Sequence, residues 1–218
     1  MLAVFCDFDG TFAVQDVGST LARIHLGERR AQLWREFERG GQTAWDYAIR
    51  LFEGFDLPEP ELHRFLETVE LDPGAHALVA WCAKRDVPFQ IVSDGFDYNL
   101  ERLQEIHGVR FDYTANELRY VDGRWTLRPG RPAPECECGT GICKRSVIEA
   151  WRATHSQDCC VHIGDGRVSD TCGALAADLV FAKASLAEEL EARGRSFERF
   201  RDLNDVIASL ESRFSDLG

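Results

Sequence analysis

Two aspartates directly follow the first apolar run of the sequence. The run at 2–6 is typical of a buried strand, and it ends in the motif DFDGT at 7–11. Because residues two apart point the same way in an extended strand, Asp7 and Asp9 are predicted to leave the strand end close together. Two such like charges are best tolerated around a divalent cation, or when one carboxyl is protonated. Either state suits phosphoryl transfer.

Polar residues also end a second apolar stretch and open a later helix. Ser93, Asp94 and Gly95 lie at the end of a predicted strand, where a hydroxyl and backbone amides suit phosphate oxygens. Lys144 begins a predicted helix, and its ammonium group can neutralise developing phosphoryl charge. These residues are therefore candidates for binding a phosphoryl group.

A third apolar stretch, at 159–163, is followed by two more acidic residues. Asp165 and Asp170 supply further oxygen ligands for a hard cation such as Mg²⁺. Each of these polar groups follows a predicted strand or opens the helix after it, and the carboxyl ends of parallel strands meet at one edge of a sheet. We therefore expect the groups to converge there.

The elements that must position these residues alternate between strands and helices from residue 75 onward. This alternation predicts an α/β fold with a Rossmann-like parallel sheet core. The charged segment at 188–201 is expected to form a solvated helical face. The other predicted elements are a helix at 75–85, a strand at 87–93, a helix at 98–107, a hairpin at about 117–128, a helix at 142–155, a strand at 159–163, a helix at 171–177 and a strand at 179–181.

The segment after the first strand has a different pattern. Apolar residues recur there at three- and four-residue spacing, until proline and glycine break the pattern at Pro73 and Gly74. We expect a small helical cap at 14–73, inserted after the first strand. The catalytic core then comprises 1–13 and 74–218, including a loop rich in cysteine, proline and glycine at about 130–143.

Composition narrows the classes of partner. The chain of 218 residues has a formal net charge of -12, which opposes binding to nucleic acid or to an anionic membrane. No apolar run approaches the roughly 18 residues of a membrane helix, and the start lacks a secretory signal pattern. We expect a cytoplasmic protein, a monomer or homodimer, that acts on a small phosphorylated metabolite.

The polar motifs, taken in order, resemble those of the haloacid dehalogenase superfamily, in its phosphatase branch. The four motifs are the segment 7–11, Ser93, Lys144 and the segment 164–170. The resemblance implies that Asp7 attacks phosphorus and forms an aspartyl-phosphate. It also implies that Asp9 protonates the leaving oxygen and then activates the hydrolytic water.

The resemblance further implies a cofactor and supporting residues. Mg²⁺ would be held by Asp7, the backbone carbonyl of Asp9 and Asp165. Asp170 would support the metal or the lysine. Thr11, Ser93 and Lys144 would bind phosphoryl oxygens or orient the nucleophile.

Two features bear on the substrate. The cap position and the hairpin are similar to the phosphoserine phosphatase group, whereas the cysteine-rich stretch running into Cys143-Lys144 resembles methionine-salvage enolic phosphatases and phosphocholine or phosphoethanolamine phosphatases. The methionine-salvage enzymes share an aspartate nine residues after the nucleophile, here Asp16, and Arg50 is a candidate for binding a substrate carboxylate. By resemblance, the enolic phosphate of methionine salvage is preferred over phosphoserine or a phospho-amino-alcohol. A nonenzymatic metal or redox protein on the same scaffold is a further alternative.

The cysteine-rich loop leaves three alternatives open. Cys136, Cys138 and Cys143 could hold a structural Zn²⁺ if a fourth thiolate converges on them. They could instead pack as small apolar side chains, or include a redox-sensitive pair. The candidates for a fourth thiolate are Cys159, Cys160 and Cys172.

Overall fold

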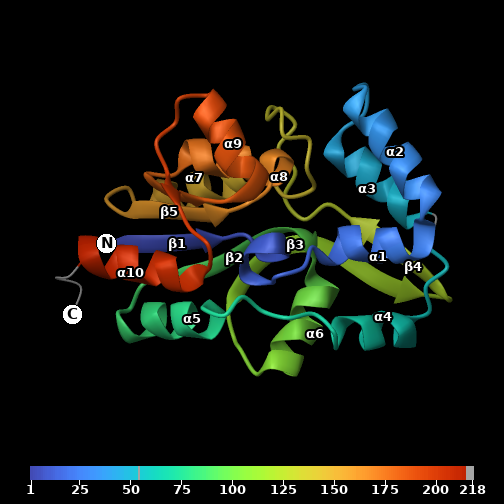
Figure 1. Ribbon diagram of the computed structural model, residues 1–218, viewed down its shortest axis with the longest axis horizontal. Helices are drawn as coiled ribbons and strands as arrows, with labels where there is room; N and C mark the ends of the chain where they lie inside the picture. The colour runs from blue at the N-terminus through green and yellow to red at the C-terminus, as the bar shows by residue number, and fades with distance from the viewer. Residues whose placement is uncertain (54, 215–218) are drawn as a thin grey trace.

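Figure 1 shows a computed structural model of the chain, which describes residues 1–53 and 55–214. Its strands are β1 (Leu2–Cys6), β2 (Phe89–Phe96), β3 (Asp112–Val121), β4 (Arg124–Arg128), β5 (Cys159–Gly164), β6 (Leu179–Ala182) and β7 (Glu198–Arg199). They form one seven-stranded sheet in the order β4-β3-β2-β1-β5-β6-β7. Neighbouring strands are parallel except β3 and β4, which form an antiparallel hairpin.

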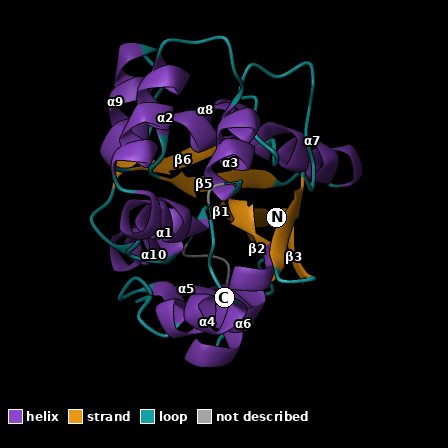
Figure 2. Cartoon of the chain, turned by 90° about the vertical axis from the view of Figure 1, so that its right-hand side faces the viewer, coloured by secondary structure: helices purple, strands orange, loops and turns teal. Residues whose placement is uncertain are grey.

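The helices of the chain either cover the two faces of this sheet or form the insertion after β1. They are α1 (Val17–Leu26), α2 (Glu28–Glu38), α3 (Ala44–Phe52), α4 (Glu59–Leu66), α5 (Ala75–Lys84), α6 (Asp97–His107), α7 (Lys144–Thr154), α8 (Arg167–Ala176), α9 (Ala184–Ala192) and α10 (Leu203–Arg213). In Figures 1 and 2, α7, α8 and α9 lie on one face of the sheet, and α5, α6 and α10 lie on the other. The predicted α/β fold, with a parallel sheet and a helical insertion after the first strand, is confirmed.

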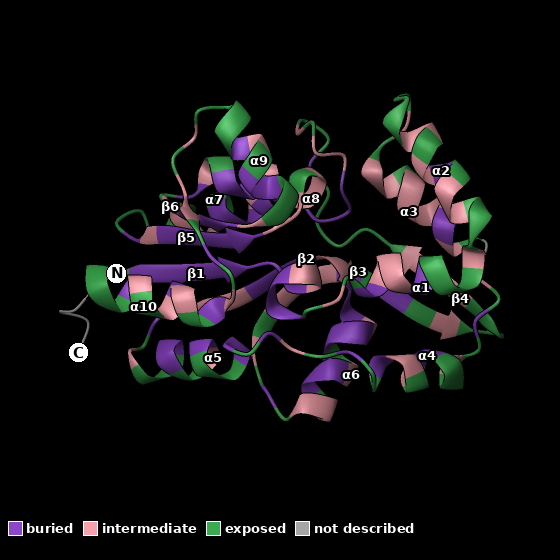
Figure 3. Cartoon of the chain, viewed as in Figure 1, coloured by how far each residue is buried: buried purple, intermediate pink, exposed green. Residues whose placement is uncertain are grey.

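Buried apolar side chains fix the two layers. Leu78, Leu100 and Leu203 belong to the cluster on the α5, α6 and α10 face, and Ile148 and Leu186 belong to the cluster on the opposite face. Every residue of β1 is buried, so this central strand is covered on both sides, as Figure 3 shows. The chain therefore leaves β1 at the centre of a rigid sheet edge, where the first acidic motif begins.

The segment predicted as a cap divides into two parts. Helices α1 to α3 have a small apolar cluster of their own, formed by Ala22, Leu33 and Leu51. Helix α4 instead packs beside α6, and its Leu62 and Leu66 belong to the large core cluster. The domain boundaries at 14–73 stay a prediction, with α1 to α3 as the part that stands beside the core in Figure 1.

The expectation of a solvated helical face at 188–201 holds only in part. Helix α9 ends at Ala192, and the chain then adds β7 to the sheet. Leu190 and Phe200 are buried against the core, whereas most of the charged residues between them are exposed. Among the residues that the structure describes, no helix has the length and apolar character needed to cross a membrane.

Candidate active site

The turn after β1 carries the first acidic motif. The amide of Asp7 continues the sheet by donating to the carbonyl of Ile163 at 2.8 Å, and the amide of Ala13 closes the turn on the carbonyl of Phe8 at 2.8 Å. Gly10 has a φ of 75°, and a Cβ at this position would lie 2.5 Å from Oδ2 of Asp165. Glycine therefore lets the turn approach the acidic end of β5 closely.

A buried lysine joins two aspartates at the same sheet edge. The Nζ atom of Lys144 lies 2.6 Å from Oδ1 of Asp7 and 2.5 Å from Oδ1 of Asp170. Lys144 and Asp170 are each 0% exposed. Nε2 of His162 lies 3.1 Å from the same oxygen of Asp170. The nucleophile predicted from the sequence thus has a fixed cationic neighbour.

The electrostatics of this cluster keep the lysine charged. Burial alone lowers the pKa of Lys144, but the carboxylates of Asp170 and Asp7 raise it above its ordinary value. Burial raises the pKa of Asp170, and Lys144 and His162 together bring it below its ordinary value. Burial lowers the pKa of His162, so the neutral ring donates from Nε2 to Asp170. The Oδ1 atom of Asp170 therefore accepts from both Lys144 and His162, and it fixes Lys144 beside Asp7.

The acidic side chains also form a group with the chemistry of a Mg²⁺ site. Asp7, Asp165 and Asp170 each offer a carboxylate oxygen within 4.8 Å of the others. Thr11 orients one of them, because its hydroxyl donates to Oδ1 of Asp165 at 2.8 Å. Burial and the charge of Asp170 raise the pKa of Asp165 to about 6 and also raise that of Asp7. The cluster thus holds more negative charge than Lys144 balances, and the oxygen donors fit Mg²⁺.

Asp9 faces the cap side of the turn. Its Oδ1 accepts a hydrogen bond from the amide of Val17 at 2.7 Å, and its Oδ2 lies 3.5 Å from the hydroxyl of Ser93. Burial and the charge of Asp16 raise the pKa of Asp9 to about 7. A Cβ at Gly95 would lie 2.8 Å from Oδ2 of Asp9, so glycine leaves room for this carboxyl. A carboxyl with a pKa near neutrality suits a general acid.

Ser93 and Asp94, at the end of β2, make different contacts. The hydroxyl of Ser93 accepts from the amide of Gly95 at 2.9 Å, which shapes the end of β2. Asp94 instead accepts from the amide of Ile142 at 3.0 Å and from Nδ2 of Asn116 at 3.1 Å. Burial raises the pKa of Asp94 to about 6, although these donors lower it. Asp94 thus ties β2 to the segment that leads into Lys144.

Two arginines of the cap, Arg50 and Arg30, have different surroundings. Arg50 pairs with Glu36 at 2.6 Å and donates to Gln42 at 3.0 Å, so its guanidinium is engaged within the cap. Arg30 donates to the hydroxyl of Ser19 at 2.6 Å, and its charge lowers the pKa of Asp16, which burial raises. Buried Nε of Arg30 has no hydrogen-bond partner within the described chain. Nothing in the sequence distinguishes Arg30 from the other cap arginines.

Asp16 connects this arginine to the catalytic edge. Its Oδ1 caps α1 by accepting from the amide of Ser19 at 2.6 Å. It also raises the pKa of Asp9, so the two carboxyls lie within electrostatic reach of each other. Asp9, Asp16 and Arg30 therefore form a sequence of interacting charges from the sheet edge into the cap.

A cleft separates the cap from the core beside this edge. Its volume is about 900 Å³, and its lining includes Thr43 at the start of α3, Glu137 in the cysteine-rich loop, and Arg145 and Arg167 on α7 and α8. The predicted catalytic carboxylates do not line it. The cysteine-rich loop lines the cleft and also contacts the cap, because the amide of Trp45 donates to the carbonyl of Gly139 at 2.9 Å.

The structure brings the polar motifs to one sheet edge, as expected for the ends of parallel strands. The side chains of Asp7, Lys144 and Asp170 make direct contact, and Thr11 binds Asp165. Asp9 approaches Ser93, whereas Arg50 lies apart within the cap. Their roles in catalysis and binding stay predictions. Sequence reasoning missed His162, Asn116 and Arg30, whose relevance depends on the contacts of the folded chain.

Comparison with known proteins gives a family and a fold. Residues 4–174 match the family described as haloacid dehalogenase-like hydrolase. The chain is 24% identical over 216 residues to the 2-hydroxy-3-keto-5-methylthiopentenyl-1-phosphate phosphatase of Bacillus mycoides (strain KBAB4), with 96% of each chain covered. It is 27% identical over 209 residues to the protein of the same name from Bacillus pumilus (strain SAFR-032), with 92% of this chain and 88% of the relative covered.

Solved structures of phosphoserine phosphatase share the architecture. A phospho-aspartyl intermediate analogue of that enzyme matches with a TM-score of 0.70 at 20% identity, covering 95% of this chain and 98% of the other. A substrate-bound complex of phosphoserine phosphatase matches with a TM-score of 0.70 at 19% identity, covering 96% and 98%. The chain belongs to the haloacid dehalogenase-like hydrolases.

Proposed function

We propose that this haloacid dehalogenase-like hydrolase is a Mg²⁺-dependent phosphomonoesterase that forms an aspartyl-phosphate on Asp7. The observation that carries the proposal is the contact of Lys144 with Asp7 at 2.6 Å, in a cluster that also contains Asp165 and Asp170. A buried nucleophile, a buried cation and a group of hard oxygen ligands are the requirements of phosphoryl transfer through an acidic residue.

In the first step, a carboxylate oxygen of Asp7 attacks phosphorus and the bond to the leaving oxygen breaks. Lys144 orients the carboxylate and offsets the charge that develops on the phosphoryl oxygens. Asp9 transfers its proton to the leaving oxygen, for which a pKa of about 7 is well matched. The products of this step are the free alcohol or enol and the aspartyl-phosphate.

In the second step, water hydrolyses the aspartyl-phosphate. Asp9, now deprotonated, accepts a proton from the water as it attacks phosphorus, and the carboxylate of Asp7 is released with inorganic phosphate. Asp7, Asp165, Asp170 and the carbonyl of Asp9 would hold Mg²⁺. When bound, this ion supplies positive charge that offsets repulsion between the nucleophile and the phosphate.

The substrate we favour is 2-hydroxy-3-keto-5-methylthiopentenyl-1-phosphate, an intermediate of methionine salvage. Support comes from relatives of that name that match 96% of this chain, and from Asp16 and the cysteine-rich loop. Phosphoserine is the second candidate, because solved phosphoserine phosphatases share the fold. Phosphocholine and phosphoethanolamine are further candidates, because the cysteine-rich loop also resembles that of phosphatases acting on these compounds. In each case the enzyme would act in the cytoplasm on a small soluble metabolite.

The cap residues suggest how the substrate would be chosen. Among the described residues, Nε of Arg30 has no hydrogen-bond partner, and Arg30 lies near Asp16, which in turn reaches Asp9. An arginine so placed would bind an oxygen-rich or anionic group of the substrate while the phosphoryl group meets Lys144. A nonenzymatic role for the scaffold is disfavoured, because the chain belongs to a hydrolase family and keeps the carboxylate–lysine cluster.

A panel of phosphorylated metabolites assayed with Mg²⁺ tests the proposal. We expect phosphate release that is fastest with the enolic phosphate, is abolished by removing Mg²⁺, and is lost in Asp7→Asn. The control is Asp178→Asn, which removes an exposed carboxylate paired with Arg152 and should keep full activity. A preference for phosphoserine would overturn the substrate assignment, and activity surviving Asp7→Asn would overturn the mechanism.

A further inference from the structure

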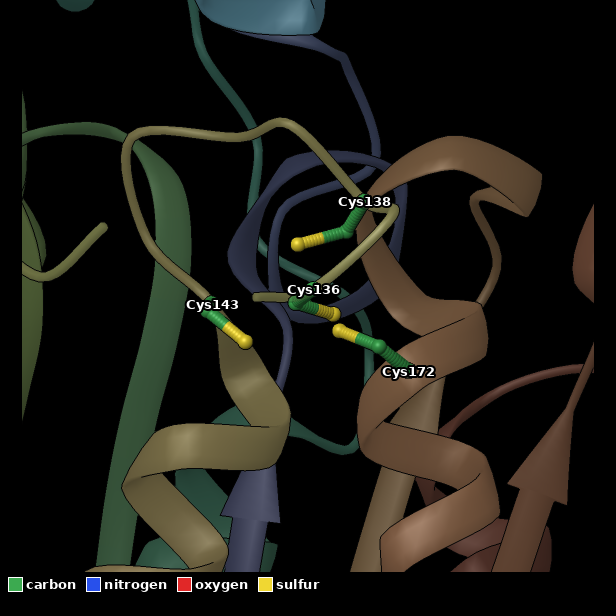
Figure 4. A group of neighbouring side chains, drawn as sticks. All are labelled: Cys136, Cys138, Cys143 and Cys172. Atoms are coloured by element: carbon green, nitrogen blue, oxygen red, sulfur yellow. The ribbon is translucent and has the colours of Figure 1, made fainter. Parts of the chain in front are cut away.

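Four cysteine thiols converge beside the catalytic edge without taking part in the phosphatase mechanism. Cys136 and Cys138 lie in the loop before α7, Cys143 immediately precedes that helix, and Cys172 lies on α8. Their sulfur atoms all lie within 4.8 Å of one another. Figure 4 shows the four side chains pointing into one shared space from these separate segments. All four are free thiols, and each is buried or half-buried.

The spacing of the sulfurs distinguishes between ligands. A tetrahedral zinc site has Zn–S bonds of about 2.3 Å, which places the sulfurs about 3.8 Å apart. Sulfurs within 4.8 Å of one another therefore need only small movements to close on one ion. An iron–sulfur cluster contains several irons and holds its cysteines farther apart. A disulfide would need two sulfurs bonded at about 2.0 Å, whereas all four cysteines are free.

We propose that Cys136, Cys138, Cys143 and Cys172 bind one structural Zn²⁺. Four thiolates around a single ion form a closed site with no position for substrate, as in structural rather than catalytic zinc sites. This ion would be separate from Mg²⁺, because soft thiolates select zinc whereas the carboxylates of the catalytic edge select a hard cation.

Neighbouring groups complete the environment of the four thiolates. The hydroxyl of Thr140 donates to the carbonyl of Ile142 at 2.8 Å, which holds the hydroxyl oxygen 3.2 Å from the sulfur of Cys138. Arg145 lies within electrostatic reach of Cys136, whose charge raises the pKa of the guanidinium, and its side chain lines the adjacent cleft. A site of four thiolates and Zn²⁺ carries excess negative charge, so a neighbouring arginine stabilises it.

The zinc would fix the loop that joins three parts of the molecule. Cys143 directly precedes Lys144, and Cys172 follows Asp170 by two residues, so the ion would tie together the two helices that carry this buried ion pair. The same loop reaches the cap through the hydrogen bond from Trp45 to Gly139. The loop has little apolar material of its own, so binding of the metal would supply much of its folding energy.

Metal analysis of the full chain tests the proposal. Protein purified without added zinc and dialysed against excess Mg²⁺ should retain about one Zn²⁺ per chain, because closed thiolate sites bind zinc tightly. The control Cys159→Ser, which alters a half-buried cysteine outside the group, should retain the same amount. Cys138→Ser and Cys172→Ser should each lose most of the zinc and unfold at a lower temperature. Zinc retained in full by both variants would overturn the assignment.

Wild-type protein provides a second measurement that does not depend on the folding of a variant. Replacement of zinc by Co²⁺ should give the intense visible absorption of tetrahedral thiolate coordination, and a mercurial reagent should release the zinc as it titrates the thiols. Wild-type protein that holds no zinc would contradict the proposal. An intact mass lower by two hydrogens per pair of cysteines would then identify a disulfide, and an unchanged mass would identify packed thiols.

Discussion

The catalytic sheet edge and the α1–α3 part of the cap hold their polar side chains in different ways. At the edge, Lys144 and Asp170 are 0% exposed and bind each other at 2.5 Å. In the cap, Arg50 and Glu36 pair at 2.6 Å with side chains 41% and 31% exposed. A buried pair cannot change partner without leaving an uncompensated charge, whereas a half-exposed pair can exchange with water. We therefore expect the edge residues to act in the reaction itself and the cap residues to act in the selection of the substrate.

This difference predicts two kinds of kinetic effect. Substitutions at the edge should lower kcat for every phosphate ester, because they alter the reacting groups. Substitutions in the cap should raise KM for the physiological substrate and leave a small aryl phosphate unaffected, since that compound has no group for the cap to bind. The predictions below test this division from the largest expected effect to the smallest.

Asp9→Asn should cause the largest loss after the nucleophile itself. We expect kcat to fall by roughly 10²- to 10⁴-fold with alkyl phosphates, because the general acid is removed. The formation of phosphoenzyme should fall less with an aryl phosphate, whose leaving oxygen needs no proton. Single-turnover kinetics with both ester types provide the measurement. An equal loss with both esters would contradict the role of Asp9 as the acid.

Lys144→Met should affect both activity and folding. We expect kcat/KM to fall by roughly 10²- to 10³-fold, as for the loss of a group that stabilises transition-state charge. The free energy of unfolding should fall by about 3 kcal/mol, because Asp170 and Asp7 would remain buried without their cation. Lys84→Met is the matched control, since Lys84 is exposed on α5 and should change neither quantity. Unchanged stability in Lys144→Met would show that the buried pair is not a structural element.

Arg30→Met should separate substrate binding from chemistry. We expect KM for the preferred substrate to rise about tenfold, which corresponds to one hydrogen bond to a charged group. The kcat for an aryl phosphate should stay unchanged. Arg50→Met is the matched control, because that arginine is already paired with Glu36, and its KM should stay within about twofold of wild type. A larger effect from Arg50 than from Arg30 would return the sequence-based candidate to the substrate site.

Asp94→Asn should have the smallest effect, visible as a pH dependence of stability. The pKa of Asp94 is raised to about 6 in the folded chain, above the ordinary value of about 4. The folded chain thus favours the protonated form of this carboxyl. The resulting contribution to the free energy of unfolding is fully present below about pH 4 and is lost as the pH rises through about 6. Relative to wild type, Asp94→Asn should gain free energy of unfolding across this window. A difference that is constant with pH would contradict the raised pKa.

Residues that follow strands could be predicted from the sequence. The apolar run of β1 and the acidic residues directly after it indicate both the strand and the edge to which Asp7 belongs. The same reasoning brought Ser93 and Asp165 to that edge, because the carboxyl ends of parallel strands must coincide. The local sequence pattern was sufficient to place these residues, because the direction of each parallel strand determines the sheet edge at which its last side chains lie.

Residues whose position depends on helix packing could not be predicted. Arg30 lies on α2 and Arg50 on α3, and only the packing of the cap helices brings Ser19 to the first and Glu36 to the second. The fourth cysteine was equally ambiguous, because Cys172 approaches the loop only when α8 packs beside α7. The prediction for 188–201 failed in part for a related reason. The many charged residues of this segment indicate a solvated face, but residues such as Phe200 pack against the core.

The most direct test of the account is chemical detection of the phosphorylated nucleophile. Protein mixed with a labelled phosphate ester and Mg²⁺, then quenched in acid, should carry label on the peptide that contains Asp7, and the label should be released by hydroxylamine as expected for an acyl phosphate. Asp7→Asn should carry none. Rapid turnover by wild-type protein without any label on this peptide would contradict the proposed aspartyl-phosphate mechanism.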